Sequence, residues 1–113
     1  MSRRESHTTL IERNRTWEGA FETEPYETAW AAEAIFFIRA LAAVGLSGPL
    51  AARVQISPDG MHWCDEGSTI PLPTTADAVT FARVSHFGGW LRLVGAVPPG
   101  ATLKVLVYLT LKA

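Results

Sequence analysis

The stretch that decides the fold is Val54-Gln55-Ile56-Ser57-Pro58-Asp59-Gly60-Met61-His62-Trp63. Apolar and polar residues alternate at its start, the alternation stops at Ser57-Pro58-Asp59-Gly60, and an aromatic residue follows. Proline presets the first dihedral angle of a turn, aspartate accepts local backbone hydrogen bonds, and glycine takes the positive φ that closes the loop. The stretch therefore predicts a β-hairpin with a strand on each side of the turn.

Alternation of period two recurs along the rest of the chain. It is clearest near the C-terminus, where every second residue from Leu103 to Leu111 is apolar. Further strands are expected at 8–13, 17–23, 50–57, 61–65, 78–86 and 90–97. We expect a turn at 66–68, and the prolines of 70–73 argue against a central strand there. Turn signals recur about every ten residues without a helical crossover, which predicts an all-β fold: an antiparallel β-sandwich or jelly roll of about seven to eight strands.

Residues 29–44 are the ambiguous segment. Alanine and leucine favour a helix there, but a surface helix needs a polar face, and Glu33 and Arg39 project in directions more than about 100° apart. In a strand, one face would carry the even-numbered apolar residues from Ala34 to Val44, and the other would carry Ile35, Phe37, Arg39 and Leu41. We predict a long strand from Glu33 to Val44. Because both faces are apolar, we expect the second face to be covered by the region of Ala29 or by another subunit.

Length and composition bound the organisation of the chain. Its 113 residues suit one domain with one core. Residues 1–7 are polar, so we divide the chain into a polar N-terminal arm at 1–15, with a possible short strand, and a single β-sandwich domain at 16–113. The arm is expected to order on a neighbouring subunit.

Charge and cysteine content narrow the partners. Ten basic and eleven acidic side chains leave no broad electrostatic field for nucleic acid, so we expect no nucleic-acid partner. The apolar stretch 29–46 is interrupted by Glu33 and Arg39, so we expect no membrane span. The single cysteine, Cys64, allows no intramolecular disulfide. These observations favour a cytoplasmic protein, or one incorporated in an assembled particle.

The densest polar cluster lies at the predicted hairpin, around Asp59, His62 and Cys64. A small Cys/His enzyme would pair Cys64 with His62 or His86 as nucleophile and base, but the sequence offers no third orienting group and no oxyanion element. The spacing of these residues also matches no zinc pattern. We therefore expect a protein that is not an enzyme, with no catalytic residue, no metal site and no cofactor.

Three stretches in this order resemble small β-sandwich proteins of bacteriophages, prophages and related bacterial particles. They are the hairpin at 54–63, the stretch His86-Phe87-Gly88-Gly89-Trp90-Leu91-Arg92-Leu93, and the closing strand at 103–112. In those proteins a Ser-x-Asp-Gly-x-x-Trp hairpin precedes a Trp-Leu-Arg strand and a final strand that ends in Leu-Lys. The resemblance covers residues 33–112 and implies a jelly-roll-like sandwich with a structural or assembly role. It implies no catalytic residue.

The sequence therefore predicts a non-enzymatic structural or assembly protein. We expect a homo-oligomer, or a sandwich that binds the subunits of a virion-like or shell-like particle, through apolar strand faces. A carbohydrate-binding module with a tryptophan platform is the alternative, with a glycan as ligand, because four tryptophans are many for this length. The candidate interface or ligand residues are Trp17, Trp30, Ile35, Phe37, Leu41, Arg53, Gln55, His62 and Trp90.

Overall fold

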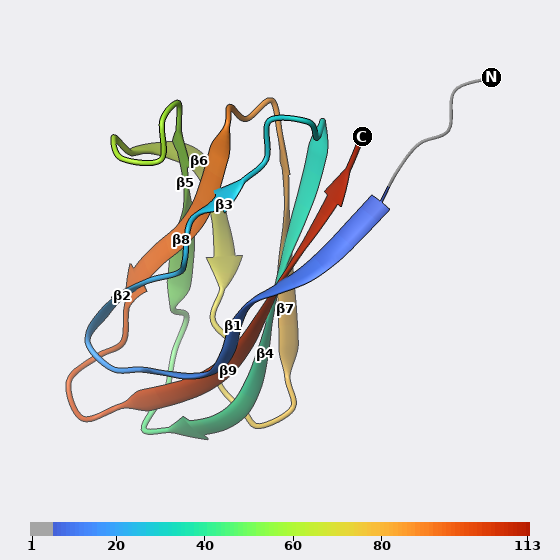
Figure 1. Cartoon of the computed structure of the whole chain (residues 1–113). Helices are drawn as coiled ribbons and strands as arrows, with labels where there is room; N and C mark the ends of the chain where they lie inside the picture. The colour runs from blue at the N-terminus through green and yellow to red at the C-terminus, as the bar shows by residue number, and fades with distance from the viewer. Residues whose placement is uncertain (1–5) are drawn as a thin grey trace.

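The computed structural model describes residues 6–113 and is an antiparallel β-sandwich, as the sequence predicts (Figure 1). Its nine strands are β1 (Ser6–Trp17), β2 (Ala20–Glu22), β3 (Tyr26–Glu27), β4 (Glu33–Val44), β5 (Ala51–Ser57), β6 (Cys64–Pro71), β7 (Val79–Ser85), β8 (Trp90–Ala96) and β9 (Thr102–Lys112). Between residues 6 and 113 there is no helix, and so none long and apolar enough to cross a membrane.

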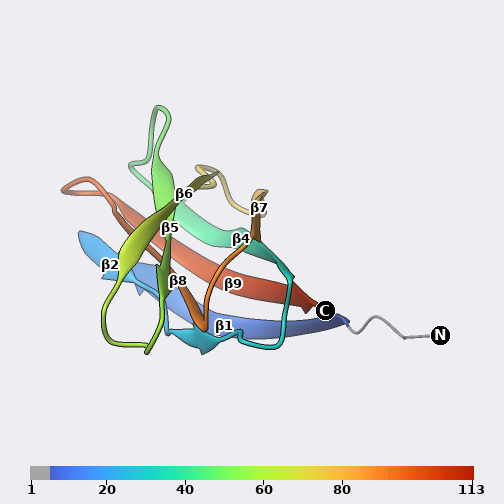
Figure 2. The same ribbon diagram turned by 90° about the horizontal axis from the view of Figure 1, so that it is seen from above.

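The strand order is that of a jelly roll. One sheet has the order β1-β9-β4-β7, and the other has the order β2-β8-β5-β6, with β3 also paired to β8. Because β2 and β3 pair with successive parts of β8, they act as one interrupted strand. Counting them as one gives eight strands in two four-stranded layers, which is the jelly-roll architecture. Figure 2 shows the two layers from above.

Inward side chains of both sheets fill the core. Phe36 and Ile38 of β4 are fully buried, and so are Leu93 of β8 and Leu109 of β9. At one end of the core the ring of Trp17 stacks on that of Phe21, with centroids 3.8 Å apart and planes 6° apart. The alternation read from the sequence therefore fixes which side chains enter the core.

The strand predicted at 33–44 has the predicted bounds, and this confirms the strand over the helix. Its even-numbered residues are buried only as far as Ala40. A β-bulge between Ala40 and Ala42 then shifts the register against β9, so that Ala42 and Val44 face solvent. The expectation that these two residues belong to the inner apolar face was wrong, because the extra residue of a bulge reverses the alternation.

The opening hairpin exists with a longer connection than predicted. Its first strand ends at Ser57, and its return strand starts at Cys64 rather than Met61 and runs to Pro71. The predicted turn at 66–68 was wrong, since these residues lie inside β6, where Gly67 takes a φ of +113°. A register shift opposite this glycine absorbs the irregularity. Pro71 is tolerated because β6 is an edge strand.

The predicted arm has two parts in the structure. Residues 1–5 lie outside the described residues. From Ser6 the chain forms β1, which pairs with β9 from Lys112 back to Leu103 with two register shifts. The short strand expected at 8–13 is thus a twelve-residue edge strand of the sandwich, and the boundary placed between residues 15 and 16 falls inside it.

Candidate functional site

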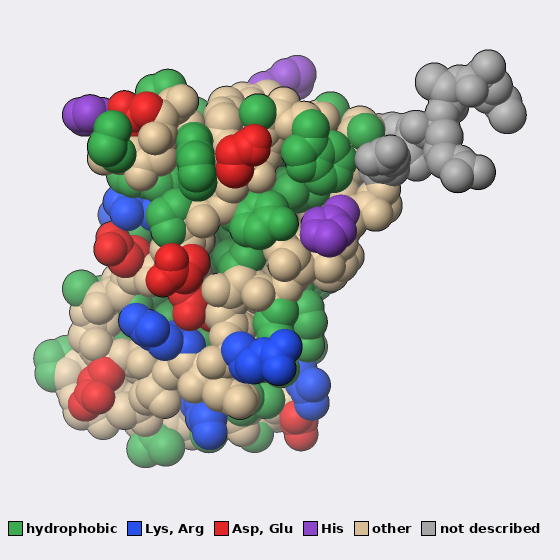
Figure 3. Space-filling view, viewed as in Figure 1, with side chains coloured by type: hydrophobic (Ala, Val, Ile, Leu, Met, Phe, Trp, Pro, Cys, Tyr) green, Lys and Arg blue, Asp and Glu red, His purple; other side chains and the backbone are tan. Residues whose placement is uncertain are grey.

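The outer faces of the two sheets differ in chemical character. We call the outer face of the four-stranded sheet the apolar face, because aromatic and aliphatic side chains occupy its centre. We call the outer face of the five-stranded sheet the polar face, because hydrogen-bonded charged side chains cross it. On the side of the molecule seen in Figure 3, acidic, basic and apolar side chains are interspersed. A sandwich surrounded by water usually keeps both outer faces polar, so the apolar face is the first candidate for an interface.

An apolar row crosses all four strands of the apolar face. Residues directly opposite each other on antiparallel strands project from the same side of the sheet. Leu10 of β1 lies opposite Tyr108 of β9, which lies opposite Phe37 of β4, which lies opposite Phe81 of β7. The rings of Phe37 and Phe81 have centroids 6.3 Å apart. Phe81, on the edge strand, is 50% exposed.

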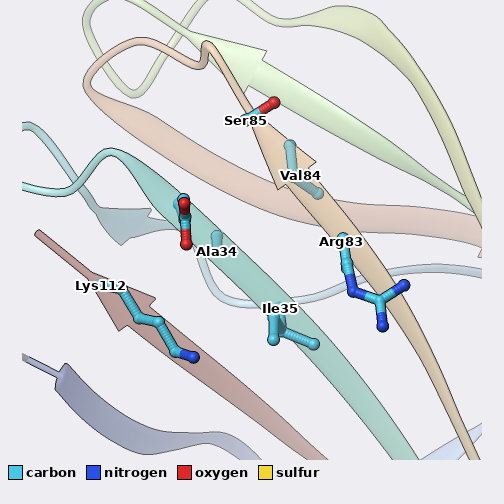
Figure 4. A pocket seen from close by; sticks show the side chains of 7 residues that line it. Ala34, Ile35, Arg83, Val84, Ser85 and Lys112 are labelled. Carbon is cyan, nitrogen blue, oxygen red and sulfur yellow. The ribbon is translucent and has the colours of Figure 1, made fainter.

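Two cations lie on one side of this row, towards Glu33. The guanidinium carbon of Arg83 lies 5.0 Å from the centroid of the Phe81 ring, a cation–π contact. A pocket of about 350 Å³ is hollowed beside it, with a lining that includes Glu33, Ile35 and Lys112. Figure 4 shows the side chains of Arg83 and Lys112 on either side of Ile35. The lining is mixed, because Glu33 lies directly opposite Lys112, and its two cations beside Ile35 suit a partner that carries carboxylates next to apolar groups.

Beyond the row, two more cations complete the set on the apolar face. Arg39 pairs with Asp77 at 3.3 Å, and Lys104 is exposed. The candidate Leu41 lies half-buried at the β4 bulge. The centre of the apolar face is thus apolar, and its two ends are mainly basic.

A chain of hydrogen bonds crosses the polar face. Arg92 of β8 donates to Glu22 of β2 and to Gln55 of β5, both at 2.9 Å. Gln55 and Arg53 in turn donate to Asp65 of β6 at 3.0 and 3.4 Å. The hydrogen bond from Gln55 is the main cause that lowers the pKa of Asp65, and the positive charge of Arg53 adds to it. Because the hydrogen-bonding groups of these side chains are already paired with one another, a partner would offer this face few new hydrogen bonds.

The hairpin turn is organised by Asp59. Its Oδ1 accepts the backbone N–H groups of Met61 and His62 at 2.8 and 2.9 Å, and its Oδ2 lies 2.6 Å from Nδ1 of His62. These bonds, led by that from the His62 backbone, hold the pKa of Asp59 far below its usual value. The sequence reasoning took this residue as a turn former, and the structure gives it that place.

The side chains of Cys64 and His62 have separate hydrogen-bond partners. Cys64 is exposed, and its thiol donates weakly to the carbonyl oxygen of Ile56 at 3.8 Å. His62 is held by Asp59, on the turn that precedes β6. Across residues 6–113, no three side chains of His, Cys, Asp or Glu stand close enough together to hold a metal ion. Among residues 6–113, the Cys64 thiol has no hydrogen bond to a histidine.

The four tryptophans do not form a common platform. Trp17 is only 2% exposed and lies in the core, so it is unavailable to a partner as it stands. One face of Trp63 is covered by Arg92, whose guanidinium carbon lies 4.3 Å from the ring centroid. The ring of Trp90 lies against the hairpin, where a Cβ on Gly60 would be 3.1 Å from it. Trp30, which is 45% exposed, is the one that presents a large accessible surface.

The structure brings together some of the predicted candidates and adds others. Ile35 and Phe37 share the apolar face, while Arg53 and Gln55 share the polar one. The sequence reasoning did not select Leu10, Phe81, Arg83 and Tyr108. Each of them is visible as an outward residue of an alternating strand, but their alignment in one surface depends on the pairing of β1, β9, β4 and β7.

Comparison with known proteins assigns no family. No protein-family model matches the chain, and no curated protein is found to be similar to it. The resemblance to sandwich proteins of bacteriophage particles therefore stays a prediction that rests on the three motifs.

Proposed function

We propose that this chain is a non-enzymatic structural protein that associates with copies of itself, or with subunits of a larger particle, through its apolar face. The observation that carries the proposal is the row formed by Leu10, Tyr108, Phe37 and Phe81. Burial of apolar surface is the main favourable term in protein association. Aromatic side chains at the centre of a patch commonly dominate its binding energy.

The distribution of polar groups supports the same proposal. A binding face with an apolar centre and charged ends resembles the arrangement of a dry interface core within a polar rim. Lys104 and Lys112 lie at the ends of the apolar face, whereas Arg39 and Arg83 flank the aromatic row directly. The opposite face of the molecule has its charged groups paired with one another.

The carbohydrate-binding alternative rests on one exposed tryptophan, Trp30. A sugar platform needs an accessible ring face, and Trp30 offers one alone. Titration with a panel of glycans, followed by tryptophan fluorescence, separates the two proposals. Carbohydrate binding predicts a fluorescence change with at least one sugar, whereas assembly through the apolar face predicts none.

Light scattering of the full chain tests the proposed function. One chain has a mass of 12.3 kDa. We expect the mean mass to rise above this value with concentration in the range of tens of micromolar, which is about where weak specific interfaces associate. A mass that stays at that of one chain over this range would contradict self-association.

A further inference from the structure

Charge is segregated on this nearly neutral molecule. The apolar face carries four cations and two acids: Arg39, Arg83, Lys104, Lys112, Glu33 and Asp77. The stretch 18–30 carries four exposed glutamates and no basic residue: Glu18, Glu22, Glu24 and Glu27. We call this stretch, which contains β2 and β3, the acidic edge. Two arginines adjoin this edge, since Arg92 pairs with Glu22 and Arg15 lines a pocket with Glu18 and Glu22, so the excess of negative charge lies at Glu24 and Glu27.

The acidic edge is held in place by the fold. The backbone N–H of Glu24 donates to the carboxylate of Glu12, a side chain only 7% exposed, at 2.9 Å. The backbone N–H of Thr28 donates to Gly89 at 2.6 Å, and that of Ala31 donates to Thr28 at 3.0 Å. Trp30 lies within this anchored turn with 45% of its surface exposed. Because the backbone of this turn is anchored, the turn loses little conformational entropy on binding.

Most of these carboxylates have no ion pair. Glu22 pairs with Arg92 at 2.9 Å. For Glu18, Glu24 and Glu27, residues 6–113 supply no cation within ion-pair distance. The chemistry that would match this edge is a basic surface with an apolar floor, and the apolar face has both properties.

We infer that the acidic edge of one copy docks on the apolar face of a second copy, with Trp30 against the aromatic row and with Glu24 and Glu27 near Arg83 and Lys112. This inference rests on the proposed function and names the partner surface. The contact is complementary in charge, because carboxylates of the edge meet cations of the face. It is also complementary in hydrophobicity, because Trp30 meets the aromatic row.

The two surfaces adjoin at Lys112, whose carbonyl oxygen accepts the backbone N–H of Ala32 at 2.8 Å, but they lie on different sides of the molecule. The acidic edge belongs to the five-stranded sheet, whereas the apolar face is the side of the four-stranded sheet that is turned away from it (Figure 1). One copy can therefore donate its edge and receive another edge at the same time. Such a head-to-tail contact is heterologous, and repetition gives a ring if the rotation closes and a filament if it does not.

The area available fits a weak but specific contact. Four strands about 4.8 Å apart, over the seven residues of β7 at about 3.3 Å each, give a projected area of about 450 Å². Both partners together would bury about 900 Å², which is the size of small, reversible interfaces. We therefore expect assembly that depends on concentration and weakens in about 0.5 M salt.

A charge-swap experiment tests the inference. One variant, Glu24→Lys with Glu27→Lys, has a basic edge and an unchanged face. A second variant, Arg83→Glu with Lys112→Glu, has an acidic face and an unchanged edge. Each alone would bring like charges together, so we expect the association of each to be at least about tenfold weaker than that of the natural chain. In a 1:1 mixture both kinds of contact regain opposite charges, and association should return.

The outcomes separate the inference from the function on which it rests. Sedimentation velocity of each variant and of the mixture, at one total concentration, is the measurement, and thermal midpoints near that of the natural chain show that the variants are folded. If the basic-edge variant assembles as the natural chain does, or if the mixture stays as dissociated as its components, the head-to-tail contact is wrong while self-association stands. If the natural chain itself stays monomeric, the self-association on which this inference rests fails first.

Discussion

Phe37 of β4 and Phe81 of β7 lie directly opposite each other on the outer side of the four-stranded sheet, with ring centroids 6.3 Å apart. Neither ring enters the core, since the inward neighbours of these residues are Phe36 and Ala82. Two aromatic rings on the outside of a small sandwich add little to folding. Their position is explained if the face on which they lie is buried in an assembly.

The first prediction concerns this pair. Replacing Phe81, which is 50% exposed on an edge strand, with threonine should change the free energy of unfolding by no more than about 1 kcal/mol, the range of a cross-strand aromatic pair. The same change should weaken self-association, as measured by sedimentation velocity. The control is Met61→Thr, because Met61 is 74% exposed on the hairpin turn, away from the apolar face. If the two variants associate equally well, Phe81 is not part of the interface.

A second prediction compares two neighbours in the sequence. Phe36 is fully buried, so Phe36→Ala should lower the free energy of unfolding by about 3–5 kcal/mol through lost burial and a residual cavity. Phe37→Ala, on the outer face, should cost about 1 kcal/mol, the range of strand propensity differences. Urea denaturation of monomeric samples measures both. Similar costs at the two positions would contradict the alternation of β4.

The third prediction concerns Gly95 of β8. A Cβ at this position would lie 2.7 Å from Cζ of Phe21 and 3.4 Å from the backbone of Ala52. Gly95→Ala should therefore displace Phe21 from its stack on Trp17 and cost about 1–3 kcal/mol. Thermal denaturation gives the cost, and a change in the Trp17 fluorescence reports the lost stack. A variant that also carries Phe21→Leu should recover part of the stability, whereas no recovery would place the strain elsewhere.

The sequence predicts the positions of strands better than it predicts features that depend on the pairing between strands. The strand at 33–44 was predictable because a two-sided apolar pattern with one acid and one base has no polar helical face. The bulge after Ala40 was not, because an extra residue is defined only by the pairing with β9. The apolar row was not predictable either, because strand pairing defines it. Leu10 and Tyr108 are far apart in sequence, and only the register of β1 against β9 makes them neighbours.

The hairpin illustrates a partial success. Pro58, Asp59 and Gly60 were correctly identified as a turn, with Gly60 at a φ of +80°. The start of the return strand was misplaced because Asp59 captures two backbone N–H groups, which extends the turn through His62. Local hydrogen bonds of aspartate compete with strand pairing, and the sequence does not show which prevails.

The fourth prediction follows from Asp59. Its pKa is held below the ordinary value of 3.8, so its ionised form stabilises the fold above that pH, and this contribution is lost as the pH falls towards the lowered pKa. Asp59→Asn should lower the thermal midpoint at pH 7, and the difference from the natural chain should narrow below about pH 4. Calorimetry over this pH range measures the effect. A difference that is constant with pH would show that the carboxylate charge contributes nothing.

Hydroxyl-radical footprinting tests whether the apolar face is buried on association, because it reports the solvent exposure of individual side chains. The full chain is labelled at low concentration, where it is dissociated, and at high concentration, where it is assembled. We predict that Phe81 and Tyr108 become protected as concentration rises, while Met61 on the hairpin turn keeps its reactivity. Labelling of Phe81 and Tyr108 that stays the same in the assembled sample would contradict burial of the apolar face.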